Sequence, residues 1–280
     1  MAREIHPSSI VSSKAQIEDD VYIGPWCSVG PNVRIKQGAR LIQNVVVDGH
    51  TQIGRNTVFY PFTTVGLEPQ DLKYKGEPTQ CIIGDDTVVR ENVTIHRGTA
   101  TGHGQTSVGN NCLIMANAHI AHDCLLGDRI IIVNNVVMGG HVHIDHDARV
   151  MGAAALHQFV RIGRGALIGG VCGVEADVIP YGSVLGNRAR LVGLHWVWLK
   201  RNGVSSAEIH RMRQAFRLLF PRIEKKNQDV FEKRLEQVKN LYSSEPKINE
   251  IIEFIQAPSK RGLVRIAKRV DFSSEIEGAV

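Results

Sequence analysis

The 280-residue sequence lacks any apolar run long enough to span a membrane, because no stretch approaches the roughly 18 to 20 apolar residues required. The N-terminal residues also lack the basic-then-apolar pattern of a secretory signal. No CxxC spacing, no serine in a nucleophile-elbow motif and no aromatic-interleaved basic stripe are present. These absences argue against an integral membrane protein, a redox protein, a serine enzyme with a covalent acyl intermediate and a nucleic-acid-binding protein. We expect a cytoplasmic protein.

Cysteine is scarce, with five in the chain, and four of these share one position of a six-residue repeat. Val, Ala and Thr occupy the same position elsewhere, so the thiols are predicted to be small side chains of the core rather than disulfide or metal ligands. The four are Cys27, Cys112, Cys124 and Cys172.

The repeat itself is an apolar residue at every sixth position, unbroken from Val108 to Val174 and present from Ile5 to Val65. A period of six fits neither an amphipathic helix nor an alternating strand, but it is typical of a solenoid of short strands and turns. Three hexads make one triangular coil, and coils stack at about 4.8 Å. The prediction is a mainly β fold, with a left-handed parallel β-helix of hexapeptide repeats over residues 1–187.

Two insertions interrupt the repeat, near residues 67–82 and 101–107. The first carries both charge signs and an aromatic residue, at Asp71, Lys73 and Tyr74, and the second is rich in glycine. Insertions in solenoids form external loops, and loops on a rigid scaffold often carry binding groups. We expect the first loop to contribute to a binding site.

The composition changes after residue 187. Residues 188–280 hold 19 Lys and Arg against 11 Asp and Glu, whereas residues 1–187 hold 14 against 17. Ser205 and Glu208 have the spacing of a capping box, which predicts a helix to about Phe220, and further helical patterns follow at 224–242, at 246–256 and after Pro258. The prediction is a basic C-terminal α-helical domain that binds an acidic partner, with nucleic acid disfavoured.

The stretch from Asn117 to Cys124 concentrates chemistry in the middle of the repeat. It places His119, His122 and Asp123 among small and apolar residues. A neutral imidazole beside a carboxylate can take a proton from a hydroxyl or an amine near neutral pH. We therefore predict a general base here, acting on a substrate that attacks directly.

The repeat also predicts a column, because residues 18 apart in an uninterrupted β-helix lie above one another. His122, Gly140 and Gln158 should form that column, with His141 beside it. An imidazole about 4.8 Å from an unshielded glycine amide suits a base beside an oxyanion donor. Further histidines, His143 and His157, should lie on neighbouring coils.

A different class stays open at this point, since β-helices of this kind include zinc enzymes of the gamma carbonic anhydrase type. His141 and His146 are five residues apart, but no matching third ligand is evident. We predict no metal ligand and no cofactor, and metal analysis would separate a lyase from a transferase.

Several motifs resemble those of the UDP-N-acetylglucosamine O-acyltransferases that begin lipid A biosynthesis, over nearly the whole chain and in order. The combination of the first loop with the histidine stretch is specific to that family, whereas a hexad alone would indicate only the superfamily. The motifs are Gln70-Asp71-Leu72-Lys73-Tyr74, Gly76-Glu77-Pro78-Thr79, Val93 to Thr99, Asn117 to Cys124, His157-Gln158-Phe159 and Leu199-Lys200-Arg201.

The resemblance implies transfer of a 3-hydroxyacyl group from acyl carrier protein to the 3-position of UDP-N-acetylglucosamine, in a homotrimer with active sites between subunits. His122 matches the general base, Asp123 the acid that orients it and Gly140 the oxyanion donor. An acidic carrier agrees with the basic tail. Substrate-binding positions match Asp71, Lys73, His119, His141, His157, Gln158 and Arg201.

The chain-measuring position of the family matches Gly170, which should form a column with Asn134 and Gly152. Arg188 should lie one coil further on and close the acyl groove, provided that the register survives Pro180. A residue without a side chain leaves room for a longer acyl chain.

The sequence departs from the family pattern at His195, Val197 and Asn202, where Asn, Glu and Arg are common. The departure leaves open whether the acceptor is the 3-hydroxyl sugar or a 3-amino analogue. A related N-acyltransferase that acts later in the pathway is a further alternative, but it would be expected to carry an extra N-terminal domain.

Overall fold

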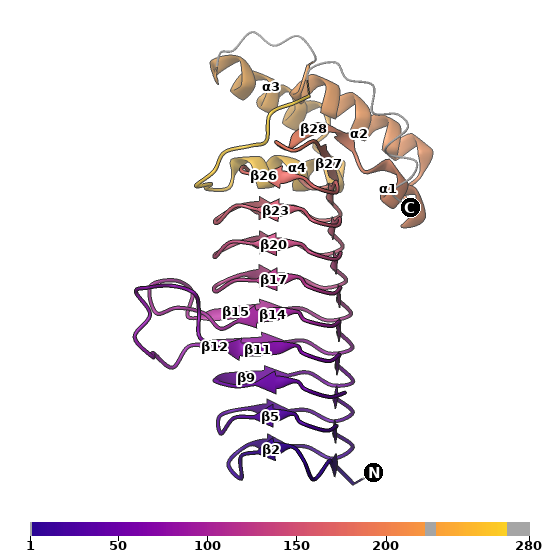
Figure 1. The fold of residues 1–280 in the computed structure, drawn as a ribbon. Helices are drawn as coiled ribbons and strands as arrows, with labels where there is room; N and C mark the ends of the chain where they lie inside the picture. The colour runs from indigo at the N-terminus through magenta and orange to yellow at the C-terminus, as the bar shows by residue number, and fades with distance from the viewer. Residues whose placement is uncertain (1, 222–227, 268–280) are drawn as a thin grey trace.

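The computed structural model describes residues 2–221 and 228–267 and consists of a tall parallel β-helix with helices at its C-terminal end (Figure 1). Three sheets form the faces of the β-helix, and their strands pair in parallel except for the last pair of the first sheet, β27 and β28. The apolar hexad therefore forms the expected solenoid.

Within the described residues, the first sheet has eleven strands, the second nine and the third eight. The first contains β1 (Glu4–Ile5), β4 (Tyr22–Ile23), β7 (Arg40–Leu41), β10 (Val58–Phe59), β13 (Val88–Val89), β16 (Leu113–Ile114), β19 (Ile131–Ile132), β22 (Arg149–Val150), β25 (Leu167–Ile168), β27 (Gly182–Leu185) and β28 (Arg190–Leu194). The second contains β2 (Ile10–Val11), β5 (Ser28–Val29), β8 (Val46–Val47), β11 (Thr64–Leu67), β14 (Thr94–His96), β17 (His119–Ile120), β20 (Val137–Met138), β23 (Ala155–Leu156) and β26 (Gly173–Val174). The third contains β3 (Gln16–Ile17), β6 (Arg34–Ile35), β9 (His50–Ile53), β12 (Gln80–Ile83), β15 (Gln105–Val108), β18 (Leu125–Leu126), β21 (His143–Ile144) and β24 (Arg161–Ile162).

Most strands are two residues long because each hexad supplies one outward and one inward side chain before the chain turns. The inward residue is the apolar one of the repeat, and Ile114, Ile132 and Val150 are fully buried on successive coils. The five cysteines are free and buried, as the repeat position predicts.

The turns between faces place one residue per corner in the left-handed backbone region, which Asn and Asp tolerate better than other non-glycine residues. Stacking of the coils lines these residues up in three columns. We call them the first corner (Asn111, Arg129, Asp147), the second corner (Asn117, Asn135, Ala153) and the third corner (Asp123, His141, Phe159).

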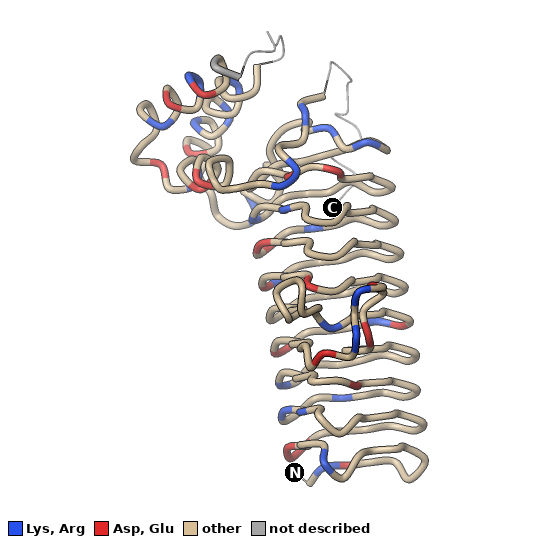
Figure 2. The backbone as a smooth tube through the Cα atoms, turned by 90° about the vertical axis from the view of Figure 1, so that its left-hand side faces the viewer, with Lys and Arg blue, Asp and Glu red and all other residues tan. Residues whose placement is uncertain are grey.

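Both insertions are external loops that connect a strand of the second sheet to a strand of the third. The first joins β11 to β12 and carries both charge signs in front of the coils (Figure 2). The second ends at Gly104, earlier than expected, because Gln105–Val108 forms β15 and pairs with β12. Both loops leave the coil register intact, since Ile83 is paired with Ile53 below and Val108 above.

Four helices follow the β-helix in the described part of the chain: α1 (Trp196–Arg201), α2 (Ser206–Leu219), α3 (Gln228–Leu241) and α4 (Pro246–Gln256). Ser205 caps α2 as predicted, because its hydroxyl accepts a hydrogen bond from the backbone N–H of Glu208 at 3.2 Å. The predicted pattern at 224–242 begins in residues outside the description, and the one at 246–256 matches α4. None of the described helices is both long and apolar enough to span a membrane.

Two features of this end were not expected from the sequence. An antiparallel pair, β27 and β28, extends the first sheet beyond residue 187. The helix predicted after Pro258 is wrong for residues 258–267, which run along the end of the β-helix instead. Their backbone bonds to its open edge, where Asp177 N–H donates to Gly262 and Val264 N–H donates to Asp177.

Candidate active site

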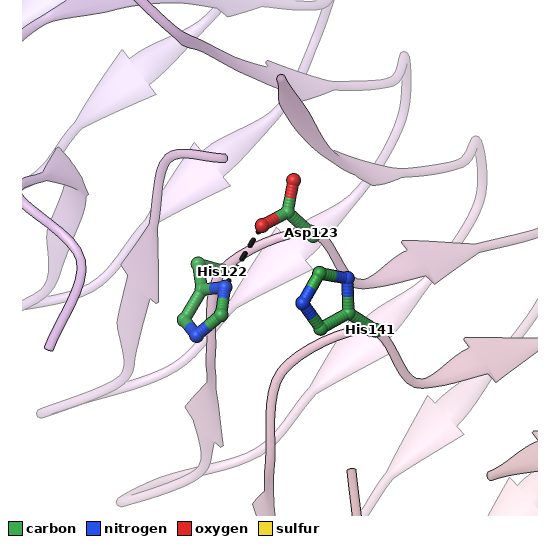
Figure 3. Close-up of side chains that lie close together, drawn as sticks. All are labelled: His122, Asp123 and His141. Carbon is green, nitrogen blue, oxygen red and sulfur yellow. Dashed lines mark hydrogen bonds and ion pairs between the residues drawn. The ribbon is translucent and has the colours of Figure 1, made fainter. Parts of the chain in front are cut away.

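Asp123 lies fully buried at the third corner and accepts hydrogen bonds from Thr99, His103 and His122, the last of which is drawn in Figure 3. The backbone N–H and hydroxyl of Thr99 donate to it, the hydroxyl at 2.6 Å, and the backbone N–H of His103 donates at 2.8 Å. Burial alone would raise the pKa of Asp123, but the hydrogen bonds from His122 and Thr99 outweigh it and hold the pKa at about 2. The carboxylate is therefore ionised at working pH.

The position of the proton on the His122 ring follows from the charge of Asp123. The Nδ1 atom of His122 lies 2.8 Å from Asp123 Oδ2, and an ionised carboxylate can only accept, so Nδ1 carries the proton and donates. In the neutral ring the opposite nitrogen, Nε2, is therefore the unprotonated acceptor. The ring is mostly buried, with 16% of the side chain exposed. This arrangement is that of an oriented general base.

Gly140 lies directly above His122, as the 18-residue column predicts. A Cβ atom at Gly140 would lie 2.5 Å from Cε1 and 2.7 Å from Nε2 of His122, so only glycine fits without displacing the ring. The backbone N–H of Gly140 donates to no acceptor among the described residues. An unused donor beside the basic nitrogen is suited to stabilise an oxyanion.

His141 and His119 flank the base. The ring of His141 is perpendicular to that of His122 at 5.2 Å between centroids and stacks in parallel on Phe159 at 4.4 Å. His119 Nδ1 bonds to the hydroxyl of Thr94 at 2.7 Å. Burial lowers the pKa of both His119 and His141, which favours neutral rings.

Two cavities meet at His122. The first, of about 480 Å³, runs along the outer face of the second sheet past Val137, Ala155 and Gly173. The second, of about 850 Å³, lies on the other side and is lined by polar residues of the first loop and the third corner. The base therefore separates an apolar groove from a polar cavity.

The predicted binding residues divide between these cavities. The polar cavity is lined by Asp71, Lys73, His141 and Gln158, and the apolar groove by His119 and His157. Arg201 lines neither cavity and is the last residue of α1. His195 is buried with Nδ1 3.0 Å from the carbonyl of Gly165, so this departure from the family pattern packs against the β-helix.

Gly170 stacks above Gly152, as expected, with its ideal Cβ 3.3 Å from the carbonyl oxygen of Gly152. The expectation that Arg188 continues this column is wrong. Above Val174 the coil shortens, and Arg188 pairs with Gly173 instead. There its guanidinium bonds to Glu175 at 3.2 Å, and Glu175 itself lines the end of the apolar groove.

Several residues of the site were not identified from the sequence. Thr99 and His103, which hold Asp123, lie between β14 and β15, where His103 belongs to the glycine-rich second loop, and a Cβ at Gly102 would lie 2.4 Å from the Asp123 carboxylate. His96 lies buried beneath the site, with its ring 4.9 Å from that of His119 and no partner for Nδ1 among the described residues. The glycine content of the second loop was the signal in the sequence, because glycines allow a loop to lie close against the coil.

A metal could be considered at one cluster. Ligand atoms of His122, Asp123 and His141 lie within 4.8 Å of one another. Asp123, however, already accepts from Thr99, His103 and His122. His146, the proposed second zinc ligand, lies elsewhere, where its Nδ1 accepts from the backbone N–H of Asp128 at 2.8 Å.

The fold and the site together define a hexapeptide-repeat acyltransferase, in which a regular β-helix carries an oriented imidazole beside an unused amide. The family described as bacterial transferase hexapeptide (six repeats) matches residues 105–140, and the one described as UDP N-acetylglucosamine O-acyltransferase, domain 2, matches residues 177–264. The chain is 44% identical over 262 residues to the acyl-[acyl-carrier-protein]–UDP-N-acetylglucosamine O-acyltransferase of Thermodesulfovibrio yellowstonii, covering 94% of this chain and 99% of the relative. The chain belongs to the UDP-N-acetylglucosamine O-acyltransferase family.

Solved structures agree with this assignment. The UDP-N-acetylglucosamine O-acyltransferase of Moraxella catarrhalis is 39% identical with a TM-score of 0.88, covering 93% of this chain and 99% of that one. The UDP-N-acetylglucosamine acyltransferase of Francisella novicida is 34% identical with a TM-score of 0.88, covering 96% of each chain.

Proposed function

We propose that the chain transfers a 3-hydroxyacyl group from acyl carrier protein to the 3-hydroxyl of UDP-N-acetylglucosamine. The observation that carries the proposal is the His122–Asp123 pair beneath the unused N–H of Gly140. Family membership supports the substrates, since the Thermodesulfovibrio relative is named for both of them.

In the proposed reaction His122 Nε2 takes the proton of the sugar hydroxyl as its oxygen attacks the thioester carbonyl. The negative charge moves to the carbonyl oxygen, which the Gly140 N–H stabilises, and Asp123 stabilises the imidazolium. The carbon–sulfur bond then breaks, and the imidazolium returns its proton to the thiolate. The products are the ester and the free thiol of the carrier, without a covalent enzyme intermediate.

The two cavities support binding of the acyl chain on one side of His122 and of the nucleotide sugar on the other. On the outer face of the second sheet the side chains become smaller on successive coils, in the order His119, Val137, Ala155 and Gly173. The apolar groove along them therefore widens, which leaves room for the acyl chain. The polar cavity, with Asp71 and Lys73, takes the sugar and nucleotide.

A homotrimer would complete the site, with Arg201 reaching the nucleotide across a subunit boundary. Support comes from the second corner and its continuation, where Trp26, Phe62 and Val171 stand exposed in one column. Exposed apolar residues in a line suggest a subunit contact. Light scattering of the purified protein should give three times the mass of the chain.

The basic helices are proposed to dock the acidic carrier. Charge reversal of Arg213, whose side chain lies on the exposed face of α2, should raise the Michaelis constant for the acyl carrier several-fold and leave that for the nucleotide sugar unchanged. Added salt should mimic the substitution. A donor dependence that is insensitive to salt would contradict this docking role.

The test of the function is an acyl-transfer assay that crosses 3-hydroxyl and 3-amino acceptor sugars with carrier donors of different lengths. His122→Ala should lower turnover by about a hundredfold or more, whereas His146→Ala, a matched histidine at the first corner, should leave it unchanged. Near-normal turnover of folded His122→Ala would remove His122 from the mechanism. Transfer only to the amine would favour the N-acylation alternative.

Metal analysis of the same preparation tests the zinc alternative. Stoichiometric zinc, together with loss of activity on chelation, would favour the metal enzyme over the proposed transferase.

A further inference from the structure

The segment Pro258–Gly262, which we call the C-terminal strap, returns from α4 to the coil that carries the predicted residues His157 and Gln158 (Figure 1). Arg261 anchors it there, because its Nε donates to the carbonyl of Gln158 at 2.8 Å and its Nη2 contacts His157 Nδ1. The other end of the strap bonds to Asp177, whose N–H donates to Gly262. The strap is thus fixed against the wall of the polar cavity.

Lys260 projects from the strap onto the third corner. Its Nζ lies 4.1 Å from the centroid of the Phe159 ring, and the other face of that ring stacks on His141, the neighbour of His122. The aromatic face holds the ammonium in place but accepts no conventional hydrogen bond. Among the residues described, none accepts a hydrogen bond or forms an ion pair with this ammonium, which leaves its donors available.

The polar cavity that Lys260 lines also contains Lys73 of the first loop, likewise without a carboxylate within 4.0 Å in the described chain. The two acidic residues of the lining, Asp71 and Asp123, already accept hydrogen bonds from the protein. Asp71 accepts from the backbone N–H of Lys73 at 3.0 Å, and Asp123 accepts from Thr99, His103 and His122. As far as the structure describes its lining, the cavity therefore offers two cations without an ion pair, against one carboxylate, Asp71, that accepts only a backbone hydrogen bond, and this balance suits an anionic ligand.

We propose that Lys260 is a phosphate-binding residue that positions a substrate in the polar cavity. The proposal rests on the proposed function, which places two phosphate-bearing molecules near His122. The phosphate belongs either to the diphosphate of the nucleotide sugar or to the phosphodiester through which the prosthetic arm joins the acyl carrier. The ammonium, already fixed over Phe159, binds such a group with little loss of side-chain freedom.

The test compares Lys260→Met, which keeps the length of the side chain, with Lys260→Arg and with Lys14→Met. Lys14 is an exposed lysine on the N-terminal coils without an ion pair in the described chain and serves as the control. Steady-state kinetics give the turnover number and the Michaelis constant for each substrate. Calorimetry gives the affinity for uridine diphosphate and for 4′-phosphopantetheine, with pantetheine as the unphosphorylated reference.

We expect Lys260→Met to raise one Michaelis constant about tenfold with turnover changed by no more than about threefold, and Lys260→Arg to restore most of the loss. Weaker binding of uridine diphosphate assigns the nucleotide as the source of the phosphate. Weaker binding of 4′-phosphopantetheine, but not of pantetheine, assigns the carrier arm.

Unchanged affinities and Michaelis constants in folded Lys260→Met would overturn the proposal, as would an equal change in Lys14→Met or a loss of turnover alone. A wild-type protein that transfers no acyl group would instead contradict the proposed function. The calorimetric comparison would still decide the phosphate site in that case.

Discussion

The first and third corners of the β-helix share one backbone conformation and differ in what their amides do. At the first corner three successive N–H groups donate to a side chain of the coil above: Asp85 N–H to Asn110, Asn110 N–H to Asp128, and Asp128 N–H to His146, all at 2.7 to 2.8 Å. At the equivalent position of the third corner Gly140 N–H has no acceptor in the described chain. At the third corner Gly140 therefore leaves space beside the His122 ring, and its own N–H is left free to bind a ligand.

The left-handed residues of the two corners differ in the same way. At the first corner Arg129 and Asp147 form an ion pair at 2.7 Å, with 53% of the arginine side chain exposed. At the third corner Asp123, His141 and Phe159 are joined to a buried base and to an aromatic stack. Solvent screens the Arg129–Asp147 ion pair, whereas burial strengthens the interaction of Asp123 with His122.

The largest effect is expected from adding one carbon at Gly140. Gly140→Ala places Cβ 2.5 Å from the His122 ring, so the ring must shift and lose its alignment with Asp123 and with the unused N–H. We expect turnover to fall by about a hundredfold or more. Gly152→Ala at the second corner is the matched control, because its Cβ would meet the nearest atom at 3.5 Å and turnover should stay near wild type.

Asp123→Asn and Asp147→Asn remove the same charge at the two corners. The amide that replaces the Asp123 carboxylate cannot provide acceptors for all of the donors now bound, and it no longer fixes the tautomer of His122, so turnover should fall by about a hundredfold. Asp147→Asn should leave turnover unchanged and lower the free energy of unfolding by less than about 1 kcal/mol. Equal kinetics for the two variants would show that the buried carboxylate has no role in catalysis.

The β-helix, its coil register and the His122–Gly140 column could be predicted from the sequence, because a hexad period fixes which residues stack. The α1 helix, the β27–β28 pair and the displaced Arg188 could not, since the repeat ends near Pro180 and the coil shortens there. The role of Thr99 and His103 was also missed. Their contacts come from the path of a loop, which no periodicity encodes.

Acid should lower the free energy of unfolding through His96, a buried histidine near the third corner that has no counterpart at the first corner. Burial, and then the neighbouring His119, lower the pKa of folded His96 to about 4, while the unfolded group keeps an ordinary pKa near 6.5. Between these values the unfolded chain binds the proton and the folded chain does not, so stability falls as the pH drops from 6.5 towards 4. The full contribution is about 3 kcal/mol.

Chemical denaturation of wild type and His96→Gln across this pH range measures that contribution. The variant should show a shallower loss of stability below pH 6.5, whereas His146→Gln, which removes a partly exposed histidine, serves as the control. A slope that is unchanged in His96→Gln would contradict the assignment.

Phe159→Leu removes the stack on His141 while keeping an apolar residue at the corner. We expect turnover to fall several-fold and the free energy of unfolding to fall by about 1 kcal/mol, since an aromatic pair contributes roughly that much. Tyr22→Leu is the control, because the Tyr22 ring packs under the Arg40 guanidinium at 4.7 Å on the N-terminal coils, away from His122. Full turnover in folded Phe159→Leu would show that the stack does not position His141.

The smallest effect is expected at the second corner, where Gly170 follows Gly152 in the column and the ideal Cβ meets only a carbonyl oxygen at 3.3 Å. Gly170 does not line the apolar groove itself but is exposed three residues before Gly173, which does, and Arg188 is placed beside Gly173. We expect the end of a long acyl chain to pass this glycine. A methionine at this position would occupy the volume of several methylenes, and each methylene that loses its burial costs about 0.8 kcal/mol, or roughly fourfold in kcat/KM. Gly170→Met should therefore shift preference to shorter donors by about fourfold for each methylene excluded, with the Michaelis constant for the sugar unchanged. Competition assays with donors of graded length measure the shift, and an unaltered chain-length profile in the folded variant would show that the acyl chain does not reach Gly170.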